Sequence, residues 1–202
     1  MAGATVRLTQ VGGAVIDTPV DTYGRWQVRL PADTSVRLFE LSMHDHDRPV
    51  QAEGVLAVTP QGVFAQLRAG AGALVLQAPS AQPRILAVDF DRQGGAVVSG
   101  MGAPGTSLSM WVDGMARGAI KADPAGRFFL AFAAPLTPGA HLLSLIAGDQ
   151  SDQVEVQIAP VDPTVTGAFR AVPEAAGWRV DWLTPGGGRQ STLLITRRRH
   201  TG

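Results

Sequence analysis

The chain has 202 residues, which is enough for one large domain or for two of ordinary size. Its formal net charge is zero, so it lacks the basic surplus with which proteins neutralise phosphate, and we expect no nucleic-acid partner. It contains no cysteine, which excludes disulfides, thiolate metal ligands and a cysteine nucleophile.

The chain shows no membrane or export signal. The opening residues, MAGATVRLTQ, lack a charged segment followed by an apolar one, so we expect no signal peptide within this sequence. The longest apolar run, FFLAFAAPL at 128–136, is far shorter than the ~20 residues that cross a bilayer as a helix. We therefore expect no membrane span.

Short runs rich in valine, leucine and threonine follow one another between glycines and prolines, and no long window keeps a helical period. In QVEVQI, the side chains of Val154, Val156 and Ile158 share one face, which predicts a strand with one buried side. Regularly spaced short strands predict an all-β fold of the β-sandwich type. In chain order the expected strands are TVRLTQV, RWQVRL, SVRLFEL, AVVSG, TSLSMWV, RFFLAF, HLLSLI, QVEVQI, WRVDWL and STLLIT.

One turn sequence recurs along the chain. DTYGRWQVRL at 21–30 and DPAGRFFLAF at 123–132 both place Asp three residues before Gly, followed by Arg and an aromatic residue. We expect the Asp side chain to accept backbone hydrogen bonds and the Gly to supply a positive φ, so that each copy turns into a strand. A looser copy, EAAGWRVDW, lies at 174–182.

The middle of the chain carries the clearest pattern. It runs from RILAVDF through GAPGTSLSMWVDG and DPAGRFF to LTPGAHLLSLI. This order resembles the bacterial Ig-like repeat modules of secreted and envelope proteins, including those found with LysM domains in alphaproteobacteria. The resemblance covers residues 83–160 well and 4–59 loosely. The resemblance implies tandem Ig-like sandwiches. It implies no catalytic residues, because the family has none that are fixed, and no peptidoglycan binding, because the LysM segment is absent from this sequence.

We therefore expect tandem Ig-like β-sandwich domains at 1–79 and 80–160, followed by a short C-terminal β-meander at 161–202. The segment QAPSAQPR, at 77–84, is the expected hinge because its two prolines interrupt strand pairing. The C-terminal residues are too few to bury a core alone. We expect them to pack on a neighbouring unit or on another chain.

The stretch LSMHDHDRPVQ raises the question of a metal site at His44 and His46. Metal sites generally need three or four ligands, and this stretch offers two histidines on one face of a strand. The only other histidines are His141 and His200. Aspartates in a hairpin loop need no metal, so we expect a polar hairpin connection and no metal or other cofactor, with His44 and His46 as weak candidates.

Two other patterns invite a catalytic or calcium-binding interpretation. In VDFDRQGG, Asp89, Asp91 and Gln93 have the spacing of calcium ligands, but the position of the required Glu is Gly100. We expect a β-turn there, with weak calcium binding at a domain rim as the alternative. No serine has the flanking glycines and linked histidine of a hydrolase, so we expect no enzyme.

The tryptophans are the candidate binding residues. Trp178, Val180 and Trp182 fall on one face of an expected strand, and Arg179 and Asp181 fall on the other. Two tryptophans on one face could stack on sugar rings, but we favour a core role in the C-terminal unit. Trp26 and Trp111 are expected in the core or at a domain interface.

These patterns favour a non-catalytic structural or protein-interaction module of the bacterial cell envelope or periplasm. We expect it to bind a protein partner, or a second copy of itself, through a strand edge. One alternative is a carbohydrate- or peptidoglycan-binding module that uses Trp178 and Trp182, with a glycan as its partner. Another is an accessory protein of a phage or secretion apparatus.

Overall fold

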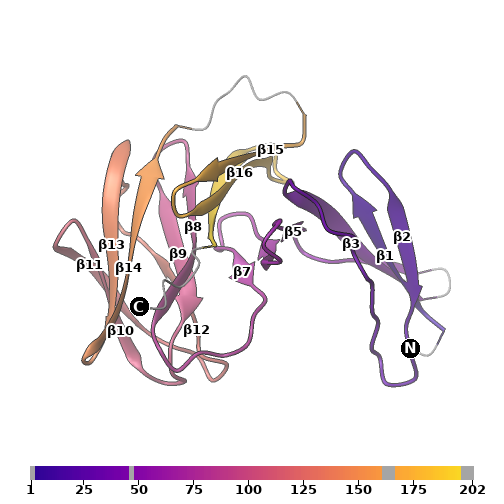
Figure 1. The fold of residues 1–202 in the computed structure, drawn as a ribbon, viewed down its shortest axis with the longest axis horizontal. Helices are drawn as coiled ribbons and strands as arrows, with labels where there is room; N and C mark the ends of the chain where they lie inside the picture. Colours follow the sequence, from indigo (N-terminus) through magenta and orange to yellow (C-terminus); the bar gives the residue numbers. More distant parts are fainter. Residues whose placement is uncertain (1–2, 46–47, 161–166, 197–202) are drawn as a thin grey trace.

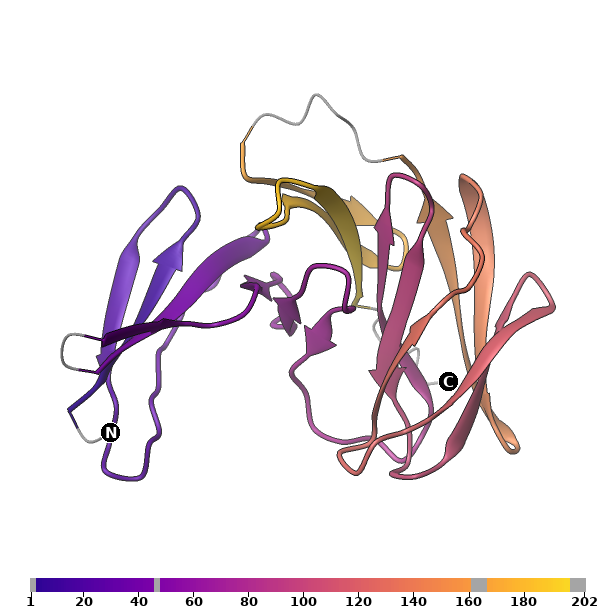
Figure 2. The ribbon, with the colours of Figure 1, turned by 180° about the vertical axis from the view of Figure 1, so that it is seen from behind.

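The computed structural model describes residues 3–45, 48–160 and 167–196. The described residues form strands and turns without a helix, so none of them forms a helix that could cross a membrane. The all-β prediction is confirmed. Three antiparallel sheets make up the fold, and Figures 1 and 2 show them from opposite sides.

The N-terminal sheet has the strand order β2-β1-β3-β5-β6-β7, with β4 paired to β3. Its hairpin of β1 and β2 projects away from the rest of the molecule in both views (Figures 1 and 2). The strands are β1 (Thr5–Gln10), β2 (Val15–Pro19), β3 (Arg37–Asp45), β4 (Arg48–Gln51), β5 (Val55–Val58), β6 (Phe64–Leu67) and β7 (Leu74–Val75).

The central sheet has the order β12-β9-β8-β17-β16-β15 and combines the middle of the chain with its C-terminal strands. The outer sheet has the order β11-β10-β13-β14. The strands of the two sheets are β8 (Arg84–Asp91), β9 (Ala96–Met101), β10 (Ser107–Val112), β11 (Met115–Lys121), β12 (Arg127–Ala131), β13 (Gly139–Ala147), β14 (Gln150–Ile158), β15 (Phe169–Glu174), β16 (Gly177–Leu183) and β17 (Arg189–Ile195).

The central and outer sheets pack face to face around the larger of the hydrophobic clusters, here called the sandwich core. Strand β14 contributes Val154, Val156 and Ile158 to it, and the residues between them are exposed, as the alternation in QVEVQI predicts. Phe90 of β8 and Phe128 of β12 come from the opposite sheet. The sandwich is therefore held by apolar burial of about 1.5–3 kcal/mol for each large side chain.

The C-terminal strands extend the central sheet. Strand β17 pairs antiparallel with β8, with Leu193 opposite Val88 and Leu194 opposite Ala87. Leu193 belongs to the sandwich core, whereas Leu194 points to the other face of the sheet. Because side chains alternate along a strand, β17 contributes side chains to the hydrophobic clusters on both faces of the central sheet.

The second face of the central sheet packs against the N-terminal sheet. The cluster between them, here called the inter-sheet core, includes Leu38 of β3, Leu67 of β6, Val180 and Trp182 of β16, and Leu194. In Figures 1 and 2, strands β5, β7, β15 and β16 lie between the N-terminal hairpin and the outer sheet. The result is a layered stack in which the central sheet is covered on both faces.

The remaining face of the N-terminal sheet carries a small cluster, here called the N-terminal core. Val6, Leu8 and Phe39 form its centre, and Val28 and Leu30 pack against it from the segment that follows β2. We predicted a strand at RWQVRL, but residues 25–30 form no strand, and that prediction is wrong. The segment has the alternation of a strand, yet none of the strands in the described residues pairs with it to form a second sheet.

The recurring Asp turn behaves as its chemistry predicts. Oδ1 of Asp123 accepts hydrogen bonds from the amides of Ala125 (2.8 Å) and Arg127 (2.7 Å), and Gly126 has φ +76°. Asp21 makes the equivalent bonds, with Gly24 at φ +77°. The positive φ that Gly adopts freely explains the fixed spacing of the motif.

Candidate functional site

The stretch that holds the weak metal-ligand candidates His44 and His46 includes the end of β3 and the start of β4, which pair antiparallel. His44 lies near the end of β3, opposite Pro49 of β4, and its Nε2 lies 3.2 Å from the Ser42 hydroxyl. His46, Asp47 and His200 lie outside the described residues. Within the described residues no group of three or more His, Asp or Glu side chains could hold a metal ion.

The calcium-like stretch VDFDRQGG forms the hairpin between β8 and β9. Oδ1 of Asp91 accepts hydrogen bonds from the amides of Gln93 (2.8 Å) and Gly95 (2.9 Å), which makes it a further copy of the Asp turn. Asp89 points away from this turn, into the inter-sheet layer. The expected β-turn is confirmed, and the two aspartates have separate environments.

Asp89 is the centre of a buried polar network between the N-terminal and central sheets. Its Oδ1 accepts hydrogen bonds from Thr192 (2.5 Å) and Gln190 (2.9 Å), and its Oδ2 accepts one from the Ala73 amide (2.6 Å). Gln190 also accepts a hydrogen bond from the Gly70 amide at 3.0 Å. Burial raises the pKa of Asp89 to about 6, although these hydrogen bonds lower it.

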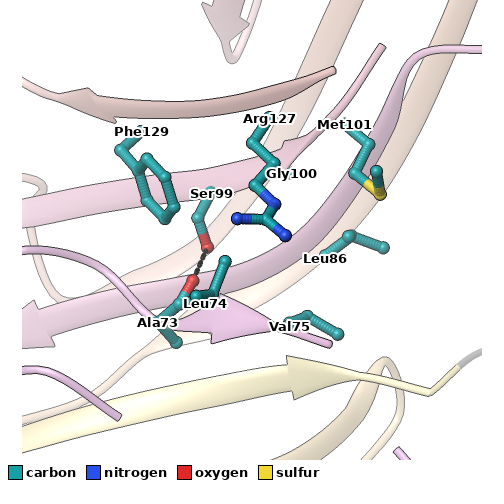
Figure 3. Close-up of a pocket in the computed structure, with 9 residues that line it drawn as sticks. All are labelled: Ala73, Leu74, Val75, Leu86, Ser99, Gly100, Met101, Arg127 and Phe129. Carbon is teal, nitrogen blue, oxygen red and sulfur yellow. Dashed lines mark hydrogen bonds between the residues drawn. The ribbon is translucent and has the colours of Figure 1, made fainter. Parts of the chain in front are cut away.

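The same network continues around a minute cavity between β7 and the central sheet. In Figure 3 the Ser99 hydroxyl points at the Ala73 carbonyl, a hydrogen bond of 2.7 Å, and Arg127 and Phe129 flank it. The cavity measures about 10 Å³, so it admits one water molecule at most. The hydrogen bonds around this cavity therefore hold residues 68–75 against the central sheet, and the cavity is too small for a substrate.

The predicted binding tryptophans pack in the inter-sheet core. Trp182 is 2% exposed and donates its indole N–H to Thr192, and Trp178 donates to the side-chain oxygen of Gln61 at 2.9 Å. A sugar could stack on Trp182 only if the N-terminal and central sheets separated, whereas Trp178 is half-buried at the edge of this core. Ligand binding at these two residues stays a prediction.

Arg179 and Asp181 lie on the opposite face of β16 from the tryptophans. Asp181 is fully buried and accepts a hydrogen bond from Ser191, and Arg179 forms ion pairs of 3.3 Å with both Asp181 and Glu174. Burial raises the pKa of Glu174 and Asp181 raises it further, against the opposing effect of Arg179. The sequence placed Arg179 and Asp181 together, but it gave no sign that Arg179 also pairs with Glu174.

A second histidine, overlooked as a structural residue, links the β10–β11 hairpin to the segment that leads into β13. His141 Nδ1 lies 2.6 Å from Asp113 Oδ2, and its Nε2 lies 2.8 Å from the Thr137 carbonyl oxygen. Asp113 is the one described residue other than glycine with a positive φ, +51°, in the hairpin between β10 and β11. The contact thus joins the VDG and LTPGAH stretches of the same unit.

An exposed tryptophan lies on the outer sheet, which the sequence interpretation missed. Trp111 of β10 is 37% exposed, and Leu142 and Ile146 of β13 are exposed on the same face. The prediction that Trp111 is a core or interface residue is wrong, and Trp26, for which we predicted the same, is 40% exposed. The alternation in SLSMWV, with Leu108 and Met110 buried, was the signal that could have placed Trp111 outside.

Comparison of this chain with protein-family models, with curated proteins and with solved structures finds no match in any of the three.

Proposed function

We propose that this chain is a non-catalytic structural and protein-interaction module of the bacterial cell envelope or periplasm, built from tandem Ig-like β-sandwich units. The observation that carries the proposal is how the chain uses its buried acids. Asp89 accepts a hydrogen bond from the Ala73 amide of another sheet, and Asp152 of β14 accepts one from the Ile85 amide at the start of β8 (2.8 Å). These carboxylates fasten backbone segments together, which is a structural use of charge.

One strand edge limits where an interaction could act. At the C-terminal end of the central sheet the edge strand is β15, and Pro173 lies within it. Proline lacks the N–H that pairing requires and is typical of edges protected from association. Association through β15 is therefore disfavoured, and other surfaces are the better candidates for docking.

Photo-crosslinking in the cells that make the protein tests the proposal. A photoreactive amino acid would replace Trp111 on the outer face, or Val50 on the N-terminal unit, and exposed Arg92 would carry it as the control. We expect a discrete protein adduct in the envelope fraction from Trp111 or Val50 and none from Arg92. Adducts absent from both positions, together with a purely cytosolic protein, would refute the proposal.

Glycan binding is the second candidate, and the outer face of the outer sheet favours it. Trp111 presents its ring there beside Ser109 on the same strand and Ser144 directly opposite. An exposed indole beside serine hydroxyl groups suits a neutral sugar. One face of the sugar ring stacks on the indole, and the sugar hydroxyls form hydrogen bonds with the serines. Sedimentation with purified peptidoglycan should then be lost in Trp111→Ala and retained in Leu183→Ala, a change at another exposed apolar residue.

A further inference from the structure

Residues 25–30, the segment RWQVRL, lie over the N-terminal core with the alternation of a strand. Val28 and Leu30 pack against that core, and Trp26 lines a groove beside it. The side chains between them are exposed: Arg25, Gln27 and Arg29. The segment therefore has an apolar inner face and a basic outer face.

The backbone of this segment is not paired with a strand. The Asp21 amide donates to the Arg25 carbonyl, which closes the preceding turn, and the Thr18 hydroxyl donates to the Gln27 carbonyl at 3.0 Å. Within the described chain, no protein group accepts a hydrogen bond from the amides of residues 26–30. A row of unpaired amides in an extended segment is a template for strand addition.

A groove of about 220 Å³ opens beside the segment. Its floor is the apolar face of β1 and β3, and Trp26, which is 40% exposed, forms part of its wall. Side chains of a strand laid next to residues 25–30 would enter this space. The main apolar lining residues are Val6, Val20, Trp26, Leu41, Met43 and Val50.

The charge of the outer face indicates the chemistry of such a strand. Arg25 lies over the Tyr23 ring, 5.9 Å from its centroid, and neither Arg25 nor Arg29 has an acidic partner among the described residues. A strand paired beside them would place its own outward side chains next to these guanidinium groups. Acidic side chains at alternate positions complement them, and basic ones repel.

We infer that residues 25–30 and the adjoining groove form a docking site for an extended strand of another protein, with apolar and acidic side chains in alternation. The partner strand pairs with those amides, at alternate residues, that point to its side of the segment. It buries its apolar side chains in the groove and places its acidic side chains beside Arg25 and Arg29. It thereby supplies the strand neighbour that residues 25–30 lack. This inference rests on the proposed interaction function and names the partner's chemistry.

A short blocked peptide of alternating valine and glutamate, added to the full chain, tests the site. Nuclear magnetic resonance should show shifts at the amides of residues 26–30 and at the groove, and titration calorimetry should give the affinity. Replacing Arg25 and Arg29 together by Gln should weaken binding about tenfold or more, whereas Arg92→Gln should leave it unchanged. A peptide of valine and lysine should bind far more weakly.

Backbone pairing is tested from the peptide side, so that misfolding of a variant cannot decide the outcome. The same peptide with N-methylated amides keeps its side chains and carbonyl acceptors, but its methyl groups prevent the close approach of two paired strands. It should therefore bind at least about tenfold more weakly. Equal binding of the methylated or lysine peptide, shifts elsewhere on the surface, or no binding would overturn the inference. So would a dimer of this chain, detected by light scattering, in which the amides of residues 26–30 are protected from exchange.

The crosslinking experiment separates failure of this site from failure of the proposed function. An envelope partner captured at Trp111, with no peptide binding at residues 25–30, rejects the docking site and keeps the interaction module. Failure of both experiments rejects both.

Discussion

The imidazole of His141 lies between two oxygen acceptors, Oδ2 of Asp113 at 2.6 Å and the Thr137 carbonyl at 2.8 Å. Both ring nitrogens donate only when the ring is protonated. Burial lowers the pKa of His141, but the hydrogen bonds to Asp113 and Thr137 raise it more, so the pKa lies above its ordinary value. The same hydrogen bond and the Leu142 amide hold the pKa of Asp113 below its usual range.

Stability should therefore depend on pH through His141. A folded-state pKa raised above 6.5 stabilises the fold fully below that pH, and the gain is lost as pH rises through the folded-state pKa. Asp113→Asn keeps a residue that tolerates positive φ but removes the charge, so it should cost about 1 kcal/mol at pH 5.5. Chemical denaturation across pH measures this, and a cost that does not shrink at alkaline pH would contradict the assignment.

Asp89 should also make the stability depend on pH, because its pKa is raised, whereas the pKa of a paired acid is usually lowered. Its folded-state pKa of about 6 lies above the unfolded value of 3.8, so the folded state binds the proton more tightly. Stability should then fall as pH rises from about 4 to about 6, by up to about 3 kcal/mol, and stay level above that range.

Asp89→Ala should remove this slope from the denaturation curves. It should also cost about 2–4 kcal/mol at pH 7, because the Ala73 amide and the Gln190 side chain lose their acceptor. A wild-type stability that rises between pH 4 and pH 6 relative to the variant would show that the carboxylate is stabilised in its ionised form.

Trp182→Ala should destabilise the protein by about 3–5 kcal/mol, because a fully packed indole leaves a cavity in the inter-sheet core. Trp111→Ala removes the same side chain from a 37% exposed position and should cost about 1–2 kcal/mol. Thermal unfolding of the two variants side by side makes the comparison. Equal losses would mean that the N-terminal and central sheets do not pack as described.

Two glycines of the Asp turns provide a matched pair. Gly24 and Gly126 have φ +77° and +76°, but a Cβ at Gly24 meets no atom within 4 Å, whereas one at Gly126 lies 2.6 Å from the Gly102 carbonyl oxygen. Gly24→Ala should cost about 1 kcal/mol from backbone strain alone, and Gly126→Ala at least about 2 kcal/mol. Urea denaturation measures both, and the larger loss must belong to Gly126.

Local chemistry determined much of this protein from the sequence alone. The two-residue alternation in QVEVQI fixes which side chains are buried, because successive side chains of a strand point to opposite faces. The Asp turns form as their residues predict, because their hydrogen bonds lie within five consecutive residues. Neither result depends on where the strand lies in the molecule.

Pairing and layering were decided only by the tertiary structure. RWQVRL has the composition and alternation of a strand, yet it has no paired neighbour, since a neighbour must come from a distant part of the chain or from another molecule. WRVDWL has the alternation of a strand with one apolar face, but which sheet covers its tryptophans depends on β17 pairing with β8. Periodicity specifies a face, and only long-range contacts specify what packs against it.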